Sequence, residues 1–112
     1  MHSGSGLLYR VDPRSGQASV VDLGGVLLTA GDGLLRHGRT LYVVRNQLNQ
    51  VAVLTLDRTG RTGTVIRTIT SPDFDIPTTV GRFGNRLYLP NARFTTPATP
   101  STPYWATQVP AR

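Results

Sequence analysis

The stretch Gly38-Arg39-Thr40-Leu41-Tyr42-Val43-Val44 decides the fold, because its start returns later in the chain as Gly84-Asn85-Arg86-Leu87-Tyr88. The two copies lie 46 residues apart, and Arg36 before the first copy is matched by Arg82 before the second. Each glycine opens a plausible tight hairpin turn. The run from Leu41 to Val44 is apolar at every position rather than at alternate ones, which is typical of a strand covered on both faces.

A second match supports the same period. Four residues of one predicted strand and its turn recur 45 residues later: Leu7, Tyr9, Val11 and Asp12 are matched by Ala52, Leu54, Leu56 and Asp57. Each set ends in a turn that contains glycine. A period of about 45 residues is the size of one propeller blade.

The composition favours strands over helices. The 112 residues include twelve glycines and eight prolines but neither lysine nor glutamate, two common formers of exposed helices. Strands are predicted at 6–11, 18–23, 34–37, 40–45, 51–56 and 64–70, with tight turns between them. The predicted class is therefore all-β.

Together the repeats predict a single domain, residues 1–112, that forms part of a β-propeller. It would hold about two to two and a half four-stranded antiparallel blades: the outer strands of one at 6–23, a complete blade at 33–70 and the inner part of a third at 77–110. The segment 94–104 is rich in threonine and proline, so we expect an extended loop there before a short strand at 105–109.

Several classes of function are disfavoured. The arginines that give the net charge of +6 are scattered, so no basic stripe for nucleic acid is expected. The chain has no cysteine, which excludes disulfides and thiolate chemistry. No segment is long and apolar enough to suggest a membrane span. The first residues lack the features of a signal peptide, so this form is expected to be soluble, although a longer parent protein would be free to carry one.

Gly31-Asp32-Gly33, followed by Gly38 to Val43, Asn46 and the stretch 49–53, resembles the repeats of the six-bladed gluconolactonase and regucalcin (senescence marker protein) propellers. This resemblance implies that a blade-opening aspartate lines a central channel and helps to bind a divalent metal, calcium or zinc. Asp32 is then the metal ligand carried over, with Asn46 as a weaker candidate. No catalytic residue is assigned.

Both candidates have plainer interpretations. Asp32 also fits an ordinary Asp-Gly turn, and asparagine often ends strands. The chain has no glutamate for the family's ligand set, and Thr78 stands where the third blade would repeat Asp32, so one copy cannot assemble a complete metal site. His37 is matched by Phe83 in the repeat, which argues against proton chemistry at that position.

The sequence therefore predicts a non-catalytic scaffold that binds a small molecule or a protein at its rim. The alternative is a metal-dependent lactone or ester hydrolase whose site is completed by remaining blades or by further copies of the chain. Two blades per chain would let about three copies close a ring. The apolar segments 41–44 and 87–89 are expected to leave hydrophobic faces at an open end.

Overall fold

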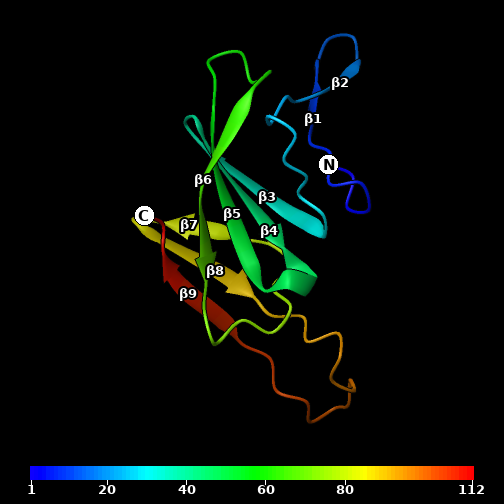
Figure 1. Ribbon diagram of the computed structural model, residues 1–112. Coiled ribbons are helices and arrows are strands. Elements are labelled where there is room, and N and C mark those ends of the chain that lie inside the picture. The colour runs from blue at the N-terminus through cyan, green and yellow to red at the C-terminus, as the bar shows by residue number, and fades with distance from the viewer.

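The computed structural model describes all 112 residues and contains three antiparallel sheets of two, four and three strands (Figure 1). The strands are β1 (Tyr9–Val11), β2 (Ala18–Val20), β3 (Gly31–His37), β4 (Thr40–Arg45), β5 (Gln50–Leu56), β6 (Gly63–Thr70), β7 (Gly81–Phe83), β8 (Arg86–Pro90) and β9 (Ala106–Pro110). One 3-10 turn, η1 (Asn46–Leu48), joins β4 to β5. Neighbouring strands follow chain order in every sheet, β1-β2, β3-β4-β5-β6 and β7-β8-β9. The all-β prediction is confirmed.

The middle sheet has the predicted strands almost residue for residue. β4 has the expected bounds, β5 and β6 each begin one residue earlier, and β3 begins at Gly31 with an irregular register near Leu34. The first hairpin is shorter than expected, since β1 begins only at Tyr9 and β2 ends at Val20. Gly6 adopts a left-handed φ of 74° close to the backbone of residues 28 and 29. Residues 6–8 therefore lie outside the β1–β2 strand pair.

The two central strands of the middle sheet, β4 and β5, are buried on both faces, as the apolar run in β4 predicted. Tyr42 and Val44 pack into a cluster with residues of the third sheet, including Leu87 and Leu89. Leu41 and Val43 face the opposite way and join a second cluster with residues next to the first hairpin, including Leu8 and Val21. Figure 1 shows the first hairpin on one side of this sheet and β7 to β9 on the other.

The third sheet is covered on one face only, and its other face is the open, partly apolar face expected around 87–89. Leu87 and Leu89 are fully buried against the middle sheet, whereas Tyr88 between them is 37% exposed. The burial of β8 and β9 alternates along each strand, as in a sheet with one covered face. No element of the chain lies over the outer face.

The repeat seen in the sequence also holds in the hydrogen bonds. Gly38 and Gly84 both occupy hairpin turns with a left-handed φ, 62° and 58°. In the first turn Arg36 Nε donates to the carbonyl of Gly38 over 2.9 Å, and in the second Arg82 Nε donates to the carbonyl of Gly84 over 2.8 Å. The same side chain therefore braces the same turn in both copies.

The aspartates of the second repeat match both accept backbone hydrogen bonds in a turn, although from residues at different spacings. Asp12 Oδ1 accepts the backbone N–H of Arg14 over 2.8 Å, and Asp57 Oδ1 accepts that of Arg61 over 2.9 Å. Backbone hydrogen bonds from the turn lower the pKa of Asp12. At Asp57 the hydroxyl of Thr59 and then the turn N–H groups lower the pKa from 3.8 to about 2. Both carboxylates hold hairpin turns.

Truncating a buried leucine of β8 tests the packing between the middle and third sheets. Leu87→Ala should lower the free energy of unfolding by about 2–5 kcal/mol, because it opens a cavity at a fully buried position. The matched change Leu48→Ala, at a side chain 46% exposed, should cost about 0.5 kcal/mol or less. Urea unfolding followed by circular dichroism measures both, and equal losses would contradict the packing.

The turn carboxylate gives the fold a dependence on acid. Because the folded pKa of Asp57 lies below its ordinary value, its contribution to stability is present above pH 3.8 and is lost as pH falls toward about 2. Asp57→Asn should remove that part of the decline in unfolding free energy, and Arg58→Ala in the same turn should retain it. Urea titrations at several pH values compare the slopes, and an unchanged slope in Asp57→Asn would count against this role.

Candidate functional site

The candidate ligands Asp32 and Asn46 meet at one end of the middle sheet. Gly31 at the start of β3 pairs with Arg45 at the end of β4, so the residues that follow each of them are neighbours. Asn46 Nδ2 donates to Asp32 Oδ2 over 3.1 Å. The carboxylate of Asp32 is exposed, and its Oδ1 accepts no hydrogen bond from the chain. The structure thus brings together the two residues that the sequence singled out.

The hydrogen bonds of the Asn46 side chain determine whether the Asp32–Asn46 pair can bind a metal ion. Its Oδ1 accepts the backbone N–H of Gln47 over 2.6 Å, so the amide turns its nitrogen, not its oxygen, toward Asp32. A hard cation such as calcium takes six to eight oxygen ligands. Nowhere in the chain do three histidine, cysteine, aspartate or glutamate side chains gather in one place. The residues present therefore do not fit a complete divalent metal site.

The segment before β7 reaches the same end of the molecule. Gly33 N–H donates to the carbonyl of Thr78 over 2.8 Å, and a Cβ on Gly33 would stand 2.5 Å from the Cα of Thr79. Glycine is needed here for this close approach of two backbones. Thr78 is the repeat counterpart of Asp32, so equivalent segments at the start of the second and third sheets lie side by side.

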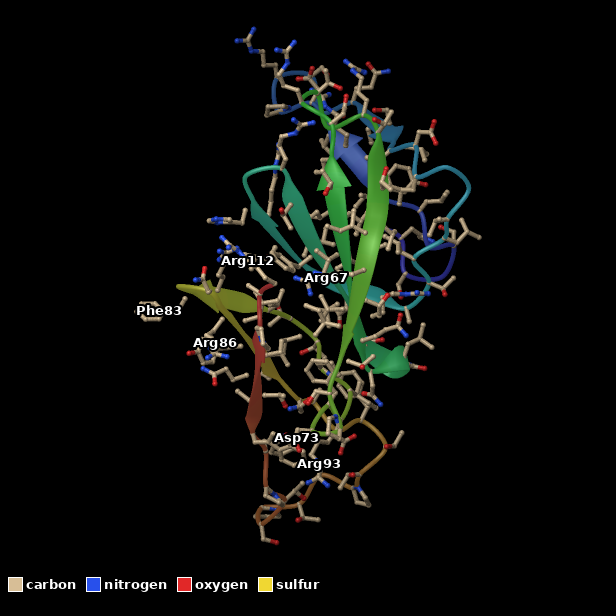
Figure 2. The ribbon with its side chains drawn as sticks, turned by 60° about the vertical axis from the view of Figure 1, so that its left-hand side comes forward. Arg67, Asp73, Phe83, Arg86, Arg93 and Arg112 are labelled. Atoms are coloured by element: carbon tan, nitrogen blue, oxygen red, sulfur yellow. The ribbon has the colours of Figure 1, made fainter.

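The long loop after β8 is closed by one arginine that sequence analysis missed. Arg93 Nε binds Asp75 Oδ2 over 2.9 Å, and its guanidinium carbon lies 4.8 Å from the ring centre of Trp105. Arg93 also donates to the carbonyl of Pro103 over 2.9 Å, and Trp105 Nε1 donates to the carbonyl of Asp73 over 3.0 Å. Figure 2 shows Arg93 and Asp73 together beside this loop.

The carboxylate of Asp75, in the segment between β6 and β7, is held in the ion pair with Arg93 and is not a freely solvated loop charge. The segment 94–104 has no strand, as predicted. The repeat could not reveal Arg93, because its counterpart 46 residues earlier is Gln47.

A basic cavity of about 290 Å³ lies where the second and third sheets meet, lined among others by His37, Arg67, Arg82 and Arg112. Tyr42 forms its inner wall: its hydroxyl donates to the carbonyl of Ala111 over 3.1 Å and accepts from Arg82 Nη1 over 3.3 Å. Arg67 donates to the same carbonyl. These bonds tie the last strand to the middle sheet.

His37 stands exposed in the lining of this cavity. Its ring makes no hydrogen bond to a carboxylate or a hydroxyl that would orient it as a general base.

Comparison with known protein families, curated proteins and solved structures found no match to the chain. No helix of the structure is long and apolar enough to cross a membrane. The site is therefore described by the chain's own geometry: an Asp32–Asn46 pair beside Thr78, a loop closed by Arg93 and an arginine-lined cavity between two sheets.

Removing the guanidinium of Arg93 should loosen the loop that it closes. In Arg93→Ala, cleavage by chymotrypsin after Phe94 and Tyr104 should become several-fold faster, because the ion pair and the contact with Trp105 are lost together. The emission of Trp105, the single tryptophan, should shift to the red. Arg14→Ala, in the exposed turn of the first hairpin, is the control. Unchanged cleavage in Arg93→Ala would show that the loop holds its shape without this residue.

Proposed function

We propose that the chain is part of a propeller-type scaffold resembling the gluconolactonase and regucalcin proteins, and that it binds a polar small molecule or a protein without catalysing a reaction. The binding surface in this proposal is the rim around Asp32, Asn46 and Thr78. The observation that carries it is that these loop ends converge, while only one carboxylate stands among them.

The arrangement of the sheets supports the scaffold part of the proposal. A four-stranded sheet whose central strands are buried on both faces lies between sheets that share its 46-residue and 45-residue repeats. The first strands of the second and third sheets, β3 and β7, begin next to each other where Gly33 contacts Thr78. Stacked antiparallel sheets whose first strands converge are what a propeller requires. Its loop ends would then share one rim.

The chemistry of the rim supports binding rather than catalysis. Asp32 offers a free carboxylate oxygen, and Gln47 next to Asn46 is exposed, so the rim presents hydrogen-bond acceptors and donors to a hydroxylated ligand. No histidine or second carboxylate is within hydrogen-bond reach of Asp32 to act as a base or an acid. The surroundings of Asp32 in this chain therefore favour binding over hydrolysis.

The alternative is a metal-dependent lactone or ester hydrolase completed by further blades or copies. One observation favours it: Asp32 and Asn46, the two positions that the resemblance assigns to the metal, are 3.1 Å apart. On this alternative the chain supplies one corner of a ligand set whose other members come from elsewhere.

Titration with δ-gluconolactone, the probe that the resemblance suggests, tests the proposal. Amide resonances of residues 31–33, 46–49 and 78–79 should shift on addition of the lactone, with or without calcium or zinc, while its spontaneous hydrolysis rate stays unchanged. Asp32→Asn should weaken the shifts, and Asp22→Asn, at an exposed aspartate in another turn, should leave them as they are.

The two candidate functions give different results in this experiment. Shifts without added hydrolysis support the scaffold. Hydrolysis that depends on calcium or zinc and is lost in Asp32→Asn overturns the non-catalytic proposal and supports the hydrolase. Absence of any shift at these residues at millimolar lactone overturns small-molecule binding at the rim.

A further inference from the structure

The outer face of the third sheet is equivalent, in the 46-residue repeat, to the face of the middle sheet that the third sheet covers. Phe83, Arg86 and Tyr88 lie on the side of β7 and β8 opposite to the buried leucines of β8. Figure 2 shows Phe83 and Arg86 on the side away from the middle sheet. Their counterparts 46 residues earlier are His37, Thr40 and Tyr42, which line the cavity between the second and third sheets.

The exposure of two equivalent tyrosines, Tyr42 and Tyr88, shows that the third sheet lacks a covering layer. Tyr42 is 2% exposed because the third sheet covers it, whereas Tyr88 at the same position of the next repeat is 37% exposed. Phe83 is 80% exposed, the highest value among the large apolar side chains. The outer face of the third sheet is thus built to receive a further sheet and has none.

The outer face of the first hairpin is the complementary half. Tyr9 and Val11 point away from the middle sheet together with Val20, the partner of Tyr9 across the hairpin, and the three are 39%, 56% and 51% exposed. The repeat counterparts of Tyr9 and Val11, at an offset of 45 residues, are Leu54 and Leu56. Both leucines are buried in the cluster between the middle sheet and the first hairpin. This face is therefore equivalent to one that is covered by a preceding sheet.

From these two equivalences we infer that the chain associates with a second copy of itself head to tail. The outer face of β7 to β9 in one copy packs on the outer face of β1 and β2 in the next, repeating between chains the contact that already exists between sheets within the chain. Each copy brings both halves, so the contact is heterologous and continues until a ring closes. Exposed apolar residues gathered on one face mark such interaction surfaces.

This inference does not depend on the rim at Asp32. Its residues lie on the outer faces of the first and third sheets, whereas the proposed binding surface lies where the second and third sheets begin. A failed lactone titration leaves the association intact, and a monomeric chain leaves rim binding intact.

Two variants, each blocked on one face, provide the test. Phe83→Asp disables the third sheet and Val11→Asp disables the first hairpin, both at side chains more than half exposed, so the core is left unchanged. Light scattering coupled to size exclusion measures the mass of each. Wild type and the matched control Leu48→Asp, at an exposed position on neither face, should have a multiple of 12.1 kDa at high concentration. Each blocked variant alone should have 12.1 kDa.

Mixing the two blocked variants in equal amounts should restore one junction and only one. The intact third sheet of Val11→Asp meets the intact first hairpin of Phe83→Asp, giving a pair of twice 12.1 kDa that does not grow further. A variant that failed to fold could not form this pair, and Tyr88→Arg offers a second way to block the third sheet.

Three results would overturn the inference. They are a wild-type chain that stays at 12.1 kDa at several hundred micromolar, a mixture that remains monomeric, or a blocked variant that keeps the wild-type mass. The last result would point to contact between identical faces. The wild-type mass also gives the number of copies that close the ring, for which the sequence suggested about three.

Discussion

The structure depends on the burial of β4 and β5 from both sides. Val43, Val44, Val51 and Leu54 are all at or below 1% exposed, and alternate residues of each strand belong to opposite clusters. Fully burying such side chains stabilises a fold by about 1.5–3 kcal/mol each. A sheet of this kind cannot stand alone in water, because either face left bare would expose a continuous apolar surface. The first hairpin and the third sheet are held to the molecule mainly by covering it.

The same constraint explains which features could be predicted from the sequence. The unbroken apolar run from Leu41 to Val44 reports double burial directly, and the repeated glycines and arginines report hairpins that recur. Segments that form strands through few local signals were harder to predict. The first hairpin is shorter than expected because the backbone at Gly6 turns toward Leu28, a contact far apart in sequence. The single-sided burial of β8 follows its alternating sequence, in which Leu87 and Leu89 are buried and Arg86 and Tyr88 lie on the open face.

At the candidate site the resemblance singled out Asp32 and Asn46, but the sequence did not predict how they interact. The two are in contact because Gly31 and Arg45, which precede them, pair at one end of the middle sheet. The direction of the Asn46 amide follows from its bond to Gln47, a local detail that no motif announces. Arg93 contacts Asp75, Pro103 and Trp105, which follow no regular spacing in the chain. Its counterpart in the preceding repeat is a glutamine. Such long-range polar contacts leave no periodic signal.

The doubly covered strands β4 and β5 organise the whole chain. Native-state hydrogen exchange measured residue by residue tests this most directly, because protection follows the free energy of local opening. We predict that the amides of β4 and β5 exchange most slowly and at a common rate, that β8 follows, and that β1, β2 and the segment 94–104 exchange fastest. If β4 and β5 exchanged as readily as the first hairpin, the middle sheet would not be the core of this fold.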